Sequence, residues 1–88
     1  MPMHTWSEHV VHVELLSKDD ELARTAGRFL EQRFRAQDVE VNTQAGALRV
    51  HSEPGRKVSA AEVALAMLDA GVRVHALHER VEWSVADV

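Results

Sequence analysis

The spacing of apolar residues switches repeatedly between two periods along this chain, and the order of these switches constrains the fold most. Residues 9–16 alternate with the two-residue repeat of a strand, and apolar residues within 22–34 recur at the three- and four-residue steps of a helix. Alternating stretches follow at residues 39–42 and 48–51, before a second helical stretch and a closing strand from Val72. The order strand–helix–strand–strand–helix–strand predicts an α+β fold, the ferredoxin-like βαββαβ sandwich.

Helix-capping residues mark both predicted helices. Ser17 precedes an acidic first turn, so we expect it to cap a helix that runs to about Phe34. Ser59 and Glu62 have the spacing of a capping box, and Gly71 stands where a helix ends in the left-handed conformation. The predicted buried stripes are Leu22, Ala26, Phe29, Leu30 and Phe34 on the first helix and Ala61, Ala64, Leu65 and Leu68 on the second.

The predicted topology leaves one face of the sheet uncovered. Right-handed crossovers place the third strand beside the first, which gives a four-stranded antiparallel sheet in the order 4-1-3-2 with both helices on one face. At 88 residues the chain is long enough for one such domain, over residues 1–88, and residues 1–8 are expected to be flexible. Because this fold serves many unrelated functions, the functional side chains are sought on the uncovered face.

Composition excludes several classes of function. The formal net charge is -4 and the basic residues are scattered, so no nucleic-acid partner is expected. The absence of cysteine removes disulfides, thiol nucleophiles and iron–sulfur clusters. No segment approaches the roughly 20 apolar residues that span a bilayer. The N-terminal segment also lacks the pattern of a signal peptide, so we expect a cytoplasmic protein without direct membrane insertion.

Three histidines fall on the predicted open face: His12 on the first strand, His51 on the third and His75 on the fourth. Neutral imidazoles on neighbouring strands are suitable ligands for zinc or nickel if the strands align them at one level. Solvated or interface histidines among charged neighbours are the alternative interpretation. The side chains predicted to make an interface, on this face or beside it, are Arg49, Arg73, Leu77 and Trp83.

No catalytic group of side chains is recognisable in the sequence. The serines lie in predicted loops and caps, and no nucleophile can be paired with a general acid and base. The chain has neither a G-x-x-x-x-G-K-[ST] phosphate loop nor a G-x-G-x-x-G turn. An enzymatic function is therefore not the first expectation, and no cofactor is expected unless the histidines bind zinc or nickel.

The C-terminal segment DAGVRVHALHERVEWSVADV resembles the end of the accessory domain that follows the nucleotide-binding domain in bacterial ABC-transporter ATPases of the drug-export type. Ala70, Gly71 and Val72 match the turn between the last helix and the last strand of that domain. Residues 83–88 are similar to its closing segment, although Trp83 stands where the family has proline. The hairpin VEVNTQAGALRVHSE and the helix that follows also resemble their counterparts.

This resemblance implies a non-catalytic regulatory or dimerisation module that acts through protein–protein contacts. Its partners would be a second copy of the chain, in a homodimer, and an ABC ATPase or permease. Two other classes of function stay open. One is a stand-alone dimer that binds a small ligand or a metal on the histidine-bearing face, and the other is a small dimeric enzyme of the ferredoxin-like kind.

Overall fold

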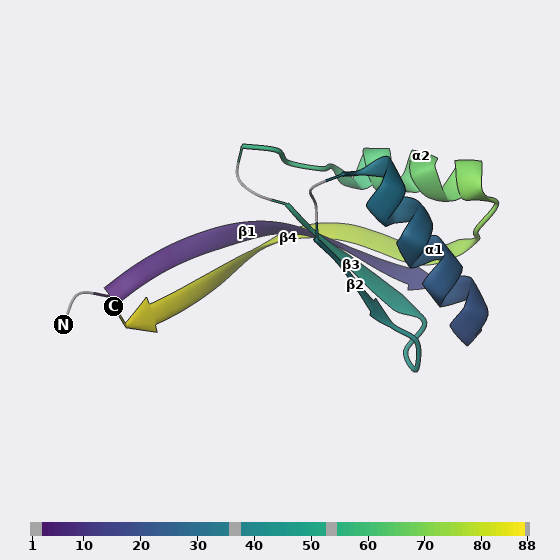
Figure 1. The fold of residues 1–88 in the computed structure, drawn as a ribbon, viewed down its shortest axis with the longest axis horizontal. Helices are drawn as coiled ribbons and strands as arrows, with labels where there is room; N and C mark the ends of the chain where they lie inside the picture. Colours follow the sequence, from purple (N-terminus) through teal and green to yellow (C-terminus); the bar gives the residue numbers. More distant parts are fainter. Residues whose placement is uncertain (1–2, 36–37, 53–54, 88) are drawn as a thin grey trace.

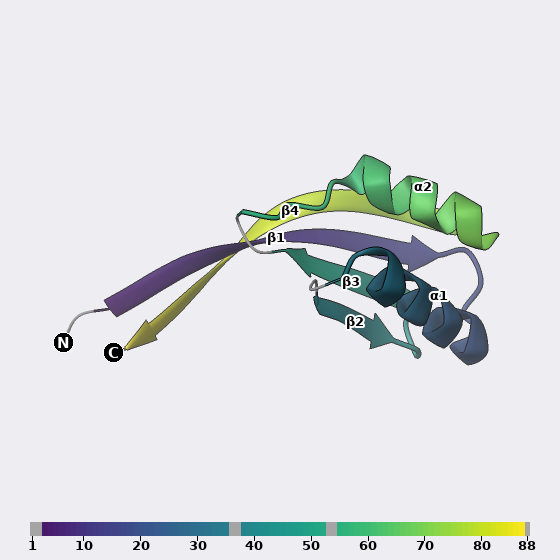
Figure 2. The ribbon, with the colours of Figure 1, turned by 45° about the horizontal axis from the view of Figure 1, so that its top comes forward.

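The computed structural model describes residues 3–35, 38–52 and 55–87, and within these ranges it describes the side chains of residues 5–83. The elements along the chain are β1 (Met3–Leu15), α1 (Asp20–Arg33), β2 (Asp38–Asn42), β3 (Ala47–Ser52), α2 (Ala60–Ala70) and β4 (Val74–Asp87) (Figure 1). The strands form one antiparallel sheet in the order β2-β3-β1-β4 with both helices on one face (Figure 2). The predicted ferredoxin-like fold and its strand order are confirmed.

The first helix is capped by Asp19 rather than by the predicted Ser17. Oδ1 of Asp19 accepts hydrogen bonds from the backbone N–H groups of Glu21 (2.9 Å) and Leu22 (3.3 Å). A carboxylate caps a helix as well as a hydroxyl does, and its negative charge also suits the positive end of the helix dipole. Both residue types occur in the segment SKDD, so the prediction misses the start of α1 by only two residues.

The capping box of α2 is confirmed, but the predicted buried stripe is wrong. The Ser59 hydroxyl accepts a hydrogen bond from the backbone N–H of Glu62, and the Glu62 carboxylate accepts one from the backbone N–H of Ser59. Gly71 ends the helix with φ 72°. Leu65 and Leu68 are 58% and 74% exposed. Because α2 is apolar around most of its circumference, the periodicity does not select one face. The residues that it buries are Val63, Ala66 and Met67.

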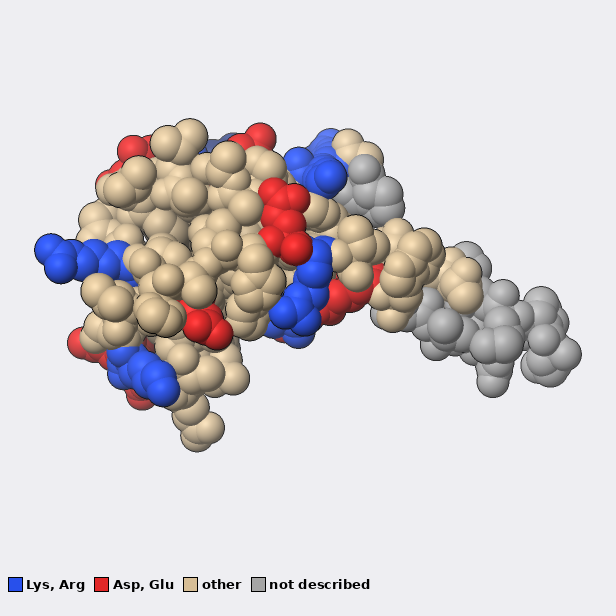
Figure 3. All heavy atoms as spheres, turned by 180° about the vertical axis from the view of Figure 1, so that it is seen from behind, with Lys and Arg blue, Asp and Glu red and all other residues tan. Residues whose placement is uncertain are grey.

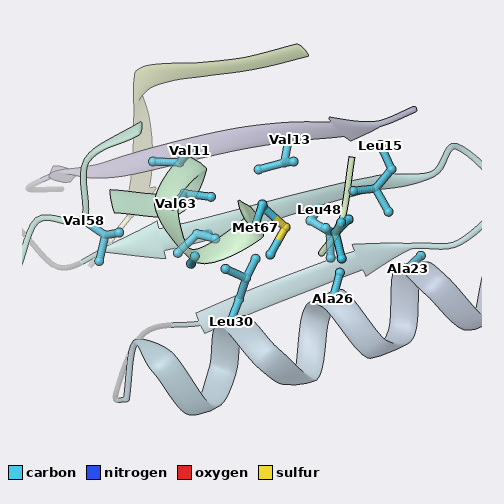
Figure 4. Close-up of a cluster of buried hydrophobic side chains, with 13 residues drawn as sticks. Val11, Val13, Leu15, Ala23, Ala26, Leu30, Leu48, Val58, Val63 and Met67 are labelled. Carbon is cyan, nitrogen blue, oxygen red and sulfur yellow. The ribbon is translucent and has the colours of Figure 1, made fainter. Parts of the chain in front are cut away.

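One hydrophobic core joins the inner face of the sheet to both helices (Figure 4). Of the stripe predicted on α1, Ala26 and Leu30 are fully buried, whereas Leu22, Phe29 and Phe34 are partly buried and pack against the core from its rim. The buried residues that the strands contribute to this core are Val11, Val13, Leu15, Leu48 and Val50.

The last strand departs from its predicted register. β4 starts at Val74 rather than at Val72, and its pairing with β1 shifts at an irregularity between Glu14 and Leu15. Because side chains alternate along a strand, an offset of one residue exchanges the two faces. The apolar residues at the start of β4 are spaced too evenly to reveal where this offset occurs.

The offset reverses the directions predicted for three side chains of β4. Leu77, which the periodicity directs outward, packs against the core, and His78, which it directs inward, lies opposite His12. Ala76, also predicted to face inward, lies opposite Glu14 on the uncovered face. Of the residues predicted to face outward here, the prediction is wrong for Leu77, whereas Arg73 and His75 are exposed.

Residues 3–8 of β1 and 82–87 of β4 form a two-stranded ribbon, which we call the arm. Among the described residues they pair only with each other, because β3 ends at Ser52 opposite His9. The arm projects from the rest of the molecule (Figures 1 and 2). With the arm included, the molecule measures 48 × 25 × 20 Å. The first strand thus starts before the predicted His9. The segment expected to be flexible belongs to the sheet from Met3 onward, while residues 1 and 2 lie outside the described part.

The buried face of α2 can be tested with two neighbouring side chains. Met67 is 1% exposed and Leu68 is 74% exposed. We expect Met67→Ala to lower the free energy of unfolding by about 2–5 kcal/mol, because it leaves a cavity in the core. Leu68→Ala is the matched control and should change it by less than about 0.5 kcal/mol. Urea unfolding followed by circular dichroism measures both, and a larger loss for Leu68→Ala would contradict this orientation of the helix.

Candidate functional site on the open face and edge of the sheet

The open face is the side of the sheet that the helices do not cover. Because directly paired residues point to the same side of a sheet, the strand registers assign its members. Figure 3 shows acidic and basic side chains next to each other where the arm leaves the body. The charged and histidine side chains of the open face are Glu8, His12 and Glu14 on β1, Asp38 and Glu40 on β2, Arg49 and His51 on β3, and His78, Arg80 and Glu82 on β4.

Arg49 links three strands across this face. Its Nη1 donates to Oε2 of Glu40 on β2 at 3.3 Å, and its Nη2 donates to both carboxylate oxygens of Glu82 on β4. Hydrogen bonds between ionised groups are stronger than those between neutral groups. The guanidinium therefore holds β4 to β3 across the intervening strand β1.

The bridge from Arg49 to Glu82 passes over Val10. Arg49 is opposite His12 and Glu82 is opposite Glu8, so the straight line between them crosses β1 at the residue midway between its two partners. Val10 points to the open face and yet is 0% exposed. By its position, the ion pair helps to cover the Val10 side chain. The apolar side chain keeps water away from that side of the ion pair.

His51 lies between two carboxylates. Its Nδ1 is 2.9 Å from Oε2 of Glu8, and its Nε2 is 3.3 Å from Oε2 of Glu40, the same oxygen that Arg49 approaches. Burial by itself lowers the pKa of the imidazole. The contacts with Glu8 and Glu40 outweigh that effect, so the pKa of His51 is raised above its ordinary value.

His12 has the opposite electrostatic environment. Its ring lies 5.1 Å from that of His78, measured between centroids, and Nε2 of His78 is 2.9 Å from Nη2 of Arg80. Burial lowers the pKa of His12, and the positive charges of His78 and Arg80 lower it further, against a smaller opposing effect of Glu14. The pKa values of His51 and His12 are therefore shifted in opposite directions.

The structure brings together only part of the predicted metal site. His12 and His51 both lie on the open face, but each contacts different side chains. His75 is exposed next to the irregularity of β4, and His78, which the prediction missed, takes the place opposite His12. Among the described residues, no group of three His, Asp or Glu side chains is arranged to hold a metal ion. Binding of zinc or nickel by His12, His51 and His75 stays a prediction without that geometry.

The four predicted interface residues fall in four different places. Arg49 is half-buried within the ion pairs described above, and Arg73 is exposed just before β4. Leu77 is partly buried against the core, whereas Trp83 on the arm is 72% exposed. Val81, which the prediction did not single out, is 55% exposed on the same side of β4 as Trp83.

An apolar groove runs between α2 and the first residues of β4. Its volume is about 590 Å³. The prediction missed it because it depends on Leu68 being exposed and on Leu77 facing the helix side. The groove is lined by Leu16, Ala64, Met67, Leu68, Gly71, Val72, Arg73, Val74 and Leu77.

Glu79 connects β4 to the start of α2 on the helix side of the sheet. Its carboxylate accepts a hydrogen bond from the backbone N–H of Ala60, in the first turn of α2. The other carboxylate oxygen lies 3.2 Å from Nε2 of His9, whose side chain is buried. A negative charge at this end of the helix is favourable, so one carboxylate holds a strand, a helix and a buried imidazole together.

Comparisons with family models, with curated proteins and with solved structures find no match for this chain. Over the residues that the structure describes, neither helix has the length and apolar character needed to cross a membrane.

The opposite environments of His51 and His12 predict opposite effects of pH on stability. A pKa raised on folding stabilises the protein below the unfolded value of 6.5, and this contribution is lost as the pH rises through the folded pKa. We therefore expect His51→Gln to destabilise the protein more at about pH 5.5 than at about pH 8.5.

His12→Gln is the matched control for this prediction. A pKa lowered on folding gives a penalty that appears as the pH falls through the unfolded value of 6.5. We expect this variant to lose less stability on acidification than the unmodified chain does. Urea unfolding at both pH values measures the two effects, and changes of the same sign in both variants would contradict the assigned environments.

Proposed function

We propose that this chain is a non-catalytic protein-interaction module that associates through β4 and the arm. The observation that carries the proposal is the exposure of large apolar side chains, Val81 and Trp83, on a strand at the edge of the sheet. Exposed tryptophan is enriched at the energetic centres of protein interfaces, and an edge strand offers unpaired backbone groups to a partner.

The open face is the weaker candidate for such a contact. Its central cation, Arg49, is already paired with Glu40 and Glu82, and His51 is already paired with Glu8 and Glu40. A partner that bound there would have to break these contacts or leave them covered, and each broken charged pair costs free energy. The outer backbone edge of β4 takes no part in these contacts, and of the described arm side chains only Glu8 and Glu82 do.

The partner class follows from the sequence resemblance. Residues 70–88, which resemble the end of the accessory domain of ABC-transporter ATPases, include all of β4 and one strand of the arm. The proposed role is therefore the regulation or assembly of an ABC ATPase or permease in the bacterial cytoplasm, by direct contact and without nucleotide chemistry in this chain. Self-association through the same surface is part of the proposal.

Trp83→Ser tests this function. We expect the variant to bind a second copy of the chain, or the purified ABC ATPase encoded nearest to its gene, at least about tenfold more weakly, because an interface tryptophan commonly contributes about 2 kcal/mol or more. Leu65→Ser removes a side chain that is 58% exposed on α2 and is the control. Analytical ultracentrifugation over a concentration series measures both. The proposal is wrong if neither partner associates, or if the two variants behave alike.

A further inference from the structure

β4 is an unusually unprotected edge strand. The sheet order leaves it with a neighbour on one side only, and it runs for 14 residues, from Val74 to Asp87. Proteins protect such edges with short strands, proline, bulges or charged side chains; β4 is long and has no proline or lysine, and its charged residues near the middle are Glu79, Arg80 and Glu82. The opposite edge, β2, is 5 residues long. The backbone of β4 is therefore the side of the sheet best suited to pair with a further strand.

We propose that this further strand is β4 of a second copy, paired antiparallel about a two-fold axis at Val81. The inference rests on the proposed function and names one partner and one register for it. The two four-stranded sheets would join into one continuous sheet, with all four helices on the same side. A two-fold axis perpendicular to the sheet is the symmetry that relates adjacent antiparallel strands in this way.

The charges of β4 select this axis. Residues at equal distances from Val81 lie opposite each other, so Arg80 meets Glu82 of the second copy, and Glu82 meets Arg80 of the second copy. An axis at Glu79, Arg80 or Glu82 instead sets that residue against its own like charge. Opposite charges directly across an antiparallel pair are favourable, and like charges are unfavourable.

Strand length restricts the axis to the middle of β4. An axis at Val81 pairs β4 from His75 to Asp87, which is nearly its whole length. An axis at Trp83 shortens the pairing to residues 79–87. Only axes near the middle of the strand use the whole edge, and of these the one at Val81 is free of like-charge pairs.

The same register covers exposed apolar surface. Val81 meets Val81 of the second copy, and Trp83 lies opposite Glu79 of the second copy, both on the helix side of the sheet. The backbone of residues 85–87 of the second copy then runs beside residues 75–77, where Leu77 lines the apolar groove. Burying this surface is favourable at roughly 25 cal/mol per Å².

Single cysteines test the register, because the chain contains none of its own. Val81→Cys should form a disulfide-linked dimer under mild oxidation, since directly opposite residues bring their Cβ atoms to about 5 Å. Glu79→Cys and Trp83→Cys should each cross-link poorly alone but efficiently when the two variants are mixed. Leu65→Cys, exposed on α2, reports random collision and should link at least about tenfold more slowly than Val81→Cys.

The outcomes of this experiment separate the register from the proposed function. If Glu79→Cys or Trp83→Cys alone cross-links as fast as Val81→Cys, or if a dimer seen by ultracentrifugation does not cross-link through Val81→Cys, the register is overturned and association through another surface stands. If the chain is monomeric but binds the ATPase, self-pairing is overturned and the interaction function stands. If the chain binds neither a second copy nor the ATPase, both the self-pairing and the interaction function are contradicted.

Charge reversal gives a second test that does not depend on oxidation. Arg80→Glu and Glu82→Arg should each weaken the dimer by about tenfold or more, because each variant sets like charges against each other. Mixed in equal amounts, the two variants should form a heterodimer with the affinity of the unmodified chain, since every charged pair is again of opposite sign. Circular dichroism checks that Glu82→Arg, which also loses the bridge to Arg49, is folded. A mixture as weak as the single variants would overturn the pairing.

Discussion

The guanidinium of Arg49 determines how the uncovered side of the sheet is organised. It reaches Glu40 on β2 and Glu82 on β4 from its own position on β3, so its contacts span the full width of the sheet. The bridge lies over Val10 and removes it from solvent. An open sheet face of this size would ordinarily expose an apolar residue at its centre, and here a charged pair supplies the cover that a helix supplies on the other side. The opposite pKa shifts of the two histidines have other causes: burial, His78 and Arg80 lower the pKa of His12, and contacts with Glu8 and Glu40 raise that of His51 against the effect of burial.

Local signals in the sequence were sufficient for the architecture. The two periods of apolar spacing gave the order of elements, and the Ser59–Glu62 capping box and Gly71 gave the limits of α2. The site was less accessible, because contacts across a sheet depend on register. One irregularity in the pairing of β1 with β4 placed His78 on the open face, opposite His12, and turned Leu77 inward. The face of α2 was also undetermined, since Leu65, Leu68 and Met67 are equally apolar and only the packed structure distinguishes them.

The surfaces of the molecule differ in whether their polar groups already have partners within the chain. On the open face the ionised side chains find partners within the chain, whereas β4 presents backbone groups on its outer side and Trp83 near its end. The resemblance to an accessory domain of transport ATPases concerns this same segment. A module that regulates by contact needs a surface whose interactions are completed only in the complex, and β4 with the arm meets that requirement better than the histidine-bearing face.

The contacts of the Glu79 carboxylate oppose a shift of β4 along β1. A long strand at a sheet edge can slip along its neighbour by two residues and still present the same faces, a displacement of about 7 Å. In this chain such a slip would carry Glu79 away from the backbone of Ala60 and from the imidazole of His9 at once. The first turn of α2 and a buried histidine would both lose their anionic partner. Glu79 therefore favours a single alignment of β4, six of whose 14 residues belong to the arm.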